Sequence, residues 1–189
     1  MNICVYGASS NNIDPKYIKD TEELGVKMGE HGHSLIYGAG ANGLMGAAAR
    51  GVTKGGGKVI GVVPSFFNVD GILYDKCEEL IYTETMRERK QIMEDRSDAF
   101  VMVPGGVGTF DEFFEILTLK QLARHAKPIA ILNISGYYDK LFQFLEHASD
   151  EGFLRETYVK MFKIFDNSDA LLDYIENYDG ELMLYKDLK

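Results

Sequence analysis

The sequence predicts an α/β protein: a single doubly wound, Rossmann-like domain with a mostly parallel sheet of about seven strands flanked by helices. Short apolar runs alternate with segments of helical periodicity from end to end, and this alternation is typical of βαβ units. Most of the runs are apolar throughout, as expected for parallel strands covered by helices on both faces. Glycines gather where the first, second and fifth runs end, which is the edge of such a sheet that binds ligands.

The strands and helices are expected in strict alternation, except that a polar connection separates the third and fourth strands. Each apolar run is short enough for a buried strand, and each intervening segment repeats apolar residues with the helical period. The expected strands cover residues 2–7, 34–38, 58–64, 79–83, 99–105, 128–133 and 161–165. The expected helices cover residues 14–31, 43–54, 86–97, 110–125, 137–151 and 168–178.

The length of 189 residues suits one domain. No repeat, linker or change of composition divides the chain, so we expect a single Rossmann-like domain over residues 1–180 and a C-terminal tail over 181–189. No apolar stretch is long enough to span a membrane, and the first strand pattern begins without a basic segment and cleavage site. We therefore expect a cytoplasmic protein that does not bind membranes.

Charge and metal-binding residue types narrow the function further. The net charge of −9 argues against a nucleic-acid-binding surface, which needs clustered Lys and Arg. Neither the two cysteines nor the histidines have the spacing of a metal site, so no metal or cofactor is expected and the histidines are interpreted as structural or surface residues. The residues concerned are Cys4, Cys77, His31, His33, His125 and His147.

The segment "GAGANG" at residues 38–43 fits the G-x-G-x-x-G pattern of dinucleotide sites. It follows the second expected strand instead of the first, and no acidic residue stands about 20 residues later to hold a ribose. An NAD-dependent enzyme is therefore disfavoured. The alternative is that Gly43 and Gly46 allow a helix and a strand to pack closely, and the motif is at least as compatible with that role.

The segment "PGGVGT" at residues 104–109 follows the fifth expected strand. Three glycines lie within four residues, whereas a plain turn needs only one or two. Glycine permits close approach of the backbone, and the free amides at a helix start can bind phosphate. The run therefore favours a phosphorylated ligand over simple chain reversal.

Glu112 has two possible roles. Thr109 and Glu112 have the spacing of a capping box, in which the carboxylate bonds back to the helix start. A carboxylate at this position would also lie near the expected pocket, where it could act as a base or stabilise a cation. The spacing leaves both roles open. The apolar stripe expected to dock this helix consists of Phe110, Phe113, Phe114 and Leu117.

The segment "TMRERK" at residues 85–90 has the same helix-start spacing, with Thr85 and Glu88 as a second capping box. Arg89 and Lys90 are spaced to share a helix face with methionines, where a cation needs a negative partner. A solvated basic turn is the alternative.

Five segments together resemble the LOG ("Lonely Guy") family of phosphoribohydrolases, which activate cytokinins from their riboside monophosphates. They are "YGASS", "YGAGANGLMG", "GVVPSFF", "MRERK" and "PGGVGTFDE". The resemblance runs from about residue 2 to residue 175. Its most specific part is the pair M-x-x-R-K and P-G-G-x-G-T-x-x-E, matched at residues 86–90 and 104–112. Such proteins were often labelled lysine decarboxylases, but nothing here marks a lysine with partners for a pyridoxal ring.

The resemblance implies hydrolysis of the N-glycosidic bond of AMP or an N6-modified adenosine 5′-monophosphate to free base and ribose 5-phosphate. It implies Arg89 and Glu112 as the catalytic pair, and a homodimer. Plant members carry a substrate-binding glutamate between the third strand and the M-x-x-R-K helix, and Asp70 is the acidic residue of this sequence nearest to that position. The residues implied in substrate binding are Gly7, Ser9, Gly43, Met45, Gly46, Asp70, Lys90, Gly105, Gly106, Val107, Gly108 and Thr109.

A second hypothesis is a non-catalytic protein that carries a nucleotide or phosphorylated cofactor in the same cleft, as molybdenum-cofactor carriers of similar fold do. It predicts tight binding without turnover. The combination of Arg89 and Glu112 counts against it, because a pure binder has less use for a carboxylate near an anion.

Overall fold

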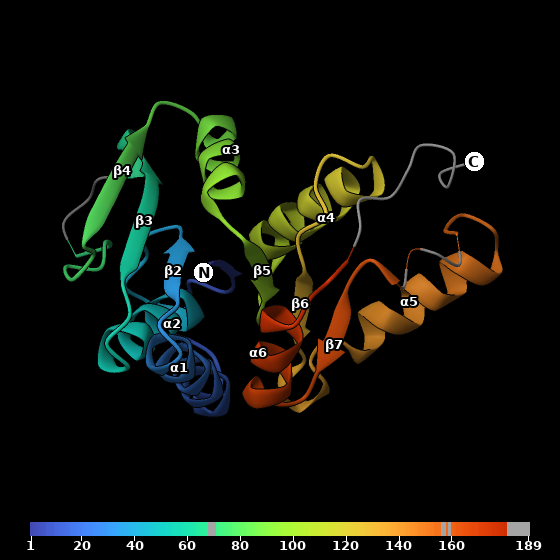
Figure 1. The fold of residues 1–189 in the computed structure, drawn as a ribbon, viewed down its shortest axis with the longest axis horizontal. Helices are drawn as coiled ribbons and strands as arrows, with labels where there is room; N and C mark the ends of the chain where they lie inside the picture. Colours follow the sequence, from blue (N-terminus) through green and yellow to red (C-terminus); the bar gives the residue numbers. More distant parts are fainter. Residues whose placement is uncertain (68–70, 156–157, 159, 181–189) are drawn as a thin grey trace.

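The computed structural model describes residues 1–67, 71–155, 158 and 160–180 (Figure 1). Within these residues, seven strands form one sheet in the order β4-β3-β2-β1-β5-β6-β7, and all six pairings between neighbouring strands are parallel. This confirms the predicted fold class. The predicted tail over 181–189 lies outside the described residues, as does Asp70. The strands are β1 (Asn2–Tyr6), β2 (Ser34–Tyr37), β3 (Val59–Pro64), β4 (Glu79–Thr83), β5 (Ala99–Met102), β6 (Ile129–Leu132) and β7 (Lys163–Phe165).

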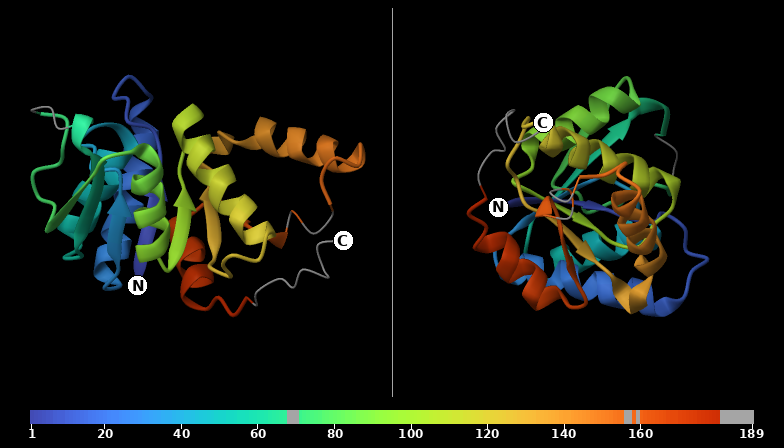
Figure 2. Two further views of the ribbon diagram at one scale, coloured as in Figure 1. Left: turned by 90° about the horizontal axis from the view of Figure 1, so that it is seen from above. Right: turned by 90° about the vertical axis from the view of Figure 1, so that its right-hand side faces the viewer.

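Helices cover both faces of the sheet (Figures 1 and 2). One face carries α1, α2 and α6, and the other carries α3, α4 and α5. Within the described ranges, no helix has both the length and the apolar character needed to cross a membrane. The helices are α1 (Pro15–Glu30), α2 (Gly43–Lys54), α3 (Met86–Arg96), α4 (Val107–Gln121), α5 (Asp139–Asp150) and α6 (Ser168–Glu176), with short 3-10 turns at Ser65–Phe67 and Ile134–Gly136.

The central strands are buried on both faces, which explains their uninterrupted apolar runs. In β1, Ile3 and Val5 pack under α1, α2 and α6, while Cys4 and Tyr6 pack under α3 and α4. The edge strands differ, because β4 and β7 consist mostly of exposed and half-buried residues. The expectation that most of the runs are buried strands is therefore confirmed, and the two exceptions are the edge strands, where one neighbour is missing.

The direction of winding reverses between β1 and β5. From β1 the chain builds outward through β2 and β3 to β4, and then returns to β5 on the other side. The connections that leave β1 and β5 diverge at their carboxyl ends, and this divergence opens a crevice in doubly wound folds. A hydrogen bond of 3.1 Å from the amide of Ala8 to the carbonyl of Pro104 joins the two connections at the base of this crevice.

The fourth helix starts earlier than predicted. Its N-cap is Gly106, with no side-chain capping bond, so Thr109 lies inside the first turn. The capping box predicted for Thr109 and Glu112 is therefore wrong: the glycine run lets the backbone enter the helix three residues sooner. At α3 the prediction is right about the cap, because Thr85 Oγ1 accepts a hydrogen bond from the amide of Glu88 at 3.1 Å.

Candidate active site

A cavity of about 660 Å³ lies at the carboxyl ends of the strands, a size typical of small-molecule sites. Its walls come from the connections after β1, β2 and β3 and from the first turns of α3 and α4. This is the edge predicted from the glycine clusters. The predicted site residues that line it are Gly7, Ser9, Met45, Arg89, Gly106, Gly108, Thr109 and Glu112.

Arg89 and Glu112 form an ion pair at the wall of this cavity, which we call the inner ion pair. Arg89 Nη1 donates to Glu112 Oε1 at 2.8 Å, and Arg89 Nε donates to the carbonyl of Val62 at 3.2 Å. The side chains are only 9% and 11% exposed. Among the described residues, neither Arg89 Nη2 nor Glu112 Oε2 has a hydrogen-bond partner, so both atoms can serve a ligand.

Burial dominates the electrostatics of Glu112. Loss of solvent raises the pKa of this carboxyl above its ordinary value, and the guanidinium of Arg89 only partly opposes the increase. A carboxylate with a raised pKa is a stronger base than an exposed glutamate, and it can exchange a proton closer to neutral pH. The inner ion pair therefore has the character of a reacting group, and the cap that competed with this role is absent.

Gly38 makes room for Arg89, a role not predicted from the sequence. A Cβ atom at residue 38 would collide with Nη2 of the Arg89 guanidinium. The sequence predicted residue 38 only as the end of a strand and the first glycine of "GAGANG", because its partner lies on a distant helix. Any side chain there would push the guanidinium away from Glu112.

The start of α4 supplies hydrogen-bond donors to the cavity. The first intrahelical bond is donated by Phe110 to the carbonyl of Gly106 at 3.0 Å, so the preceding amides have no partner within the helix. At Gly106 and Gly108 an added Cβ would meet no atom within 4 Å, which means that these glycines keep the helix start open. At Gly105 an added Cβ would collide with the hydroxyl of Thr109, so that glycine serves packing.

The start of α2, by contrast, is already occupied. The amide of Gly43 donates to Asn11 Oδ1 at 2.7 Å, and the amide of Leu44 donates to the carbonyl of Ala8 at 2.8 Å. Gly43 has a φ of 59°, and a Cβ on Gly46 would collide with the carbonyl of Ala41. Neither glycine lines the cavity. The "GAGANG" segment thus serves close packing, and only one of the two helix starts is available to a phosphate.

Two adjacent tyrosines hold the connection between β5 and α4. Tyr138 Oη donates to the carbonyl of Val103 at 2.8 Å, and Tyr137 Oη donates to the carbonyl of Gly105 at 2.9 Å. Tyr138 is only 1% exposed. Together the hydroxyls fix two carbonyls of the connection that leads from β5 into α4. The sequence predicted only that both tyrosines begin a helix over residues 137–151, whereas α5 starts at Asp139.

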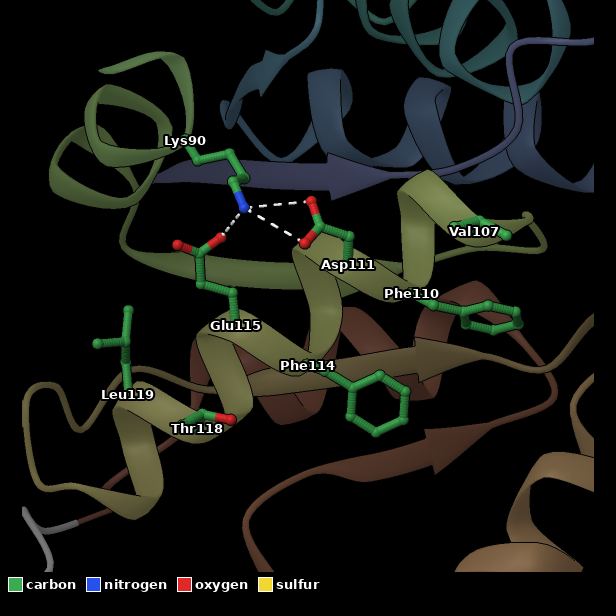
Figure 3. Close-up of a pocket in the computed structure, with 8 residues that line it drawn as sticks. All are labelled: Lys90, Val107, Phe110, Asp111, Phe114, Glu115, Thr118 and Leu119. Carbon is green, nitrogen blue, oxygen red and sulfur yellow. Dashed lines mark hydrogen bonds and ion pairs between the residues drawn. The ribbon is translucent and has the colours of Figure 1, made fainter. Parts of the chain in front are cut away.

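Lys90 lies beside an open groove along α4 (Figure 3) and does not line the cavity, whereas its partner Asp111 lines both. Its Nζ lies 3.1 Å from Asp111 Oδ2 and also pairs with Glu115. We call these the outer ion pairs. Val107 lines the same groove and is 85% exposed. A substrate contact of Lys90 or Val107 stays a prediction, because neither residue lines the cavity in the described structure.

The fold and the site define a class of α/β protein with a cavity where the direction of winding reverses, between β1 and β5. Free helix amides in this cavity suit a small phosphorylated ligand, and the buried carboxylate of Glu112 lies in its wall. A family model described as "Possible lysine decarboxylase" matches residues 45–175. Cytokinin riboside 5′-monophosphate phosphoribohydrolase LOG2 of Arabidopsis thaliana is 37% identical over 176 residues, covering 93% of this chain and 83% of that protein. The probable cytokinin riboside 5′-monophosphate phosphoribohydrolase LOGL9 of Oryza sativa subsp. japonica is 38% identical over 176 residues, covering 93% and 78%.

Among solved structures, the molybdenum cofactor binding protein of Rippkaea orientalis superposes with a TM-score of 0.71 at 23% identity, covering 93% of this chain and 94% of that chain. This likeness shows the shared fold. The chain itself belongs to the LOG family, as the family model and the curated relatives establish.

Proposed function

We propose that this protein is a nucleoside 5′-monophosphate phosphoribohydrolase. It hydrolyses the N-glycosidic bond of AMP or an N6-modified adenosine 5′-monophosphate and releases the free base and ribose 5-phosphate. The observation that carries the proposal is the inner ion pair, which lies in one cavity with the unpaired amides of α4. Membership in the LOG family supports the reaction type.

The start of α4 binds the 5′-phosphate in this proposal. Backbone amides and the positive end of the helix dipole favour an anion, and the hydroxyl of Thr109 adds a donor at the same place. Since the start of α2 is occupied by Ala8 and Asn11, it does not compete for the phosphate. Gly7 and Ser9 complete the polar side of the cavity.

Glu112 acts on the ribosyl carbon. Cleavage of a ribosyl C–N bond develops positive charge on the sugar, which a nearby carboxylate stabilises, and the same carboxylate orients or deprotonates the attacking water. Arg89 holds Glu112 Oε1, favours the ionised form of the carboxylate and leaves Oε2 for the substrate or water. Arg89 Nη2 remains available for a ribose or phosphate oxygen.

The base lies against the apolar side of the cavity. That wall is built from the start of α2, the end of β3, the connection from β3 to β4, and the start of α3. It can take up a planar purine and an apolar N6 substituent. The apolar residues of this wall are Met45, Val63, Pro64, Phe67, Ile72, Leu73 and Met86.

Incubation with AMP and with N6-isopentenyladenosine 5′-monophosphate tests the proposal. We expect release of adenine or the N6-modified base together with an equal amount of ribose 5-phosphate, measured by chromatography. Binding of both nucleotides without release of base would contradict the proposal and would favour the carrier function, which the fold alone also permits.

We further infer a cytoplasmic homodimer. Support for self-association comes from apolar side chains exposed on α4 and α5, where Val107 is 85% and Phe144 is 63% exposed. A monomeric mass by light scattering at micromolar concentration would contradict the dimer.

A further inference from the structure

Three side chains that were not related in the sequence converge at the amino edge of the sheet. His31 follows α1, His33 immediately precedes β2, and Glu176 ends α6. His31 Nδ1 and His33 Nε2 each lie 2.7 Å from Glu176 Oε1. The cavity is at the opposite end of β2, where the strand leads into Gly38, so this cluster is separate from the proposed active site.

We propose that His31, His33 and Glu176 form a binding site for a divalent transition metal, of which Zn²⁺ is the best match. Two imidazoles and one carboxylate are a donor set that zinc takes in proteins, with a fourth position left for water. All the candidate ligand atoms lie within 4.8 Å of one another. No other group of at least three His, Cys, Asp or Glu side chains in the described part of the chain has this arrangement.

A small rearrangement of the cluster accommodates the ion. Ligand atoms about 2.0–2.1 Å from a tetrahedral zinc lie about 3.3 Å apart, so the two 2.7 Å contacts must lengthen by roughly 0.6 Å. The ligand nitrogens of His31 and His33, which lie within 4.8 Å of one another, must adjust to the same spacing. The side chains of His31 and Glu176 are 46% and 31% exposed and can move, whereas His33 is 7% exposed and fixes the position of the site. The metal is reached from solvent on the side of His31.

Metal binding requires the protons on the ligating nitrogens of the cluster to move. Without metal, an N–H of each imidazole can donate to the Glu176 carboxylate. Zinc takes the lone pairs of His31 Nδ1 and His33 Nε2, so the proton on each ring moves to its other nitrogen or leaves with solvent. The Met1 ammonium, whose nitrogen lies 3.4 Å from His33 Nδ1, then turns away. The contact is long and therefore weak.

The ion would tie together distant parts of the chain. Glu176 is 145 residues from His31 and 143 residues from His33, so metal binding joins the end of α6 to the end of α1 and the start of β2. A ligand that binds only the folded state stabilises it by mass action. The expected role is structural, with no contribution to the chemistry in the cavity.

Calorimetric titration with Zn²⁺ and thermal unfolding test the site. The protein is metal-stripped, carries no histidine tag and retains Met1 as its first residue. We expect about one equivalent of Zn²⁺ to bind saturably and, at free Zn²⁺ near 100 times Kd, an increase in Tm of about 5 °C or more.

Two variants remove ligands, and one serves as the control. His31→Ala and Glu176→Gln should each weaken Zn²⁺ binding at least tenfold and abolish the increase in Tm. His147→Ala, which removes an exposed histidine of α5, should leave both unchanged. Absence of saturable binding, or binding that survives in both ligand variants, would overturn the proposal. These readouts do not use enzymatic activity and are independent of the proposed function.

Discussion

Two sets of ion pairs join α3 to α4, and they begin at neighbouring residues. The inner ion pair links Arg89 to Glu112, with side chains 9% and 11% exposed. The outer ion pairs link Lys90 to Asp111 and Glu115. The side chain of Lys90 is 20% exposed, and those of Asp111 and Glu115 are 58% and 42% exposed. The two sets bridge the same helices. Asp111 lines both the cavity and the groove, whereas Lys90 and Glu115 line only the groove, so the two sets differ in burial and in access to the cavity.

Burial gives the two sets different physical consequences. An exposed pair contributes about 0–1 kcal/mol to the free energy of unfolding, and the outer pairs are therefore modest surface bridges. Removing water from a buried pair costs several kcal/mol per ion, so such a pair is weak evidence for stabilisation. A buried pair beside a cavity is better explained by chemistry in that cavity. The predictions below test this contrast, from the largest expected effect to the smallest.

Arg89→Met should have the largest effect. It leaves the Glu112 carboxylate buried without its cation, which favours the protonated form and removes the base. We expect kcat/KM for AMP to fall by about 10³-fold or more, and the free energy of unfolding to fall by about 3–5 kcal/mol. Steady-state kinetics and thermal unfolding measure the two effects. A folded variant with activity near wild type would contradict a catalytic role for the pair.

The pH dependence of kcat/KM should follow the Glu112 carboxyl of the free enzyme. Burial raises its pKa, and the reaction needs the ionised form, so kcat/KM should fall about tenfold per pH unit below a pKa that is higher than an ordinary glutamate's. The effect of Glu112 on stability has the opposite pH dependence. The contribution of this group to the free energy of unfolding is fully present below its unfolded-state pKa and is lost as pH rises through its folded-state pKa. An acid limb at or below the ordinary glutamate range would contradict this assignment.

Tyr138→Phe should weaken the phosphate site without touching the inner ion pair. Loss of the hydrogen bond to the carbonyl of Val103 loosens the connection that directs the amides of α4. We expect about a tenfold lower kcat/KM for AMP and a smaller change for adenosine, which has no phosphate; a stability loss of about 1 kcal/mol should accompany it. Tyr174→Phe on α6 is the control, since its hydroxyl makes no hydrogen bond within the described residues. Equal losses for AMP and adenosine would indicate a general structural defect.

Lys90→Met should have the smallest effect. Partial burial lowers the pKa of Lys90, but Glu115 and Asp111 outweigh this and raise it, as expected for a cation engaged by surface carboxylates. We expect kcat/KM for AMP to change by no more than about threefold, with a stability loss of at most about 1 kcal/mol. An increase in KM above tenfold would instead support the direct substrate contact that the family resemblance implies.

The sequence predicted the parts of the molecule that depend on local pattern. Apolar runs and their order gave the parallel sheet, and the glycine run at residues 104–109 indicated the edge and the helix that bound the cavity. Spacing alone left Glu112 between cap and catalyst. In the structure α4 begins at Val107, so Thr109 is not the N-cap and the capping role of Glu112 is excluded.

Long-range contacts could not be predicted in this way. The fit of Gly38 against Arg89, the bonds from Tyr137 and Tyr138 to the β5 connection, and the occupied amides of α2 all join segments far apart in the chain. The histidine cluster is the extreme case, because Glu176 completes it from the other end of the sequence. The spacing of residues along the sequence does not indicate contacts between such distant segments.

Two matched variants of α4 test the central claim most directly. Glu112→Gln and Glu115→Gln each remove one carboxylate that pairs with a cation of α3, one inside the cavity and one outside. The single measurement is kcat for release of adenine from AMP by both variants. We predict a loss of about 100-fold or more for Glu112→Gln, with AMP binding retained, and a change within about twofold for Glu115→Gln. Equal kcat values for the two variants would contradict the assignment of the chemistry to the inner ion pair.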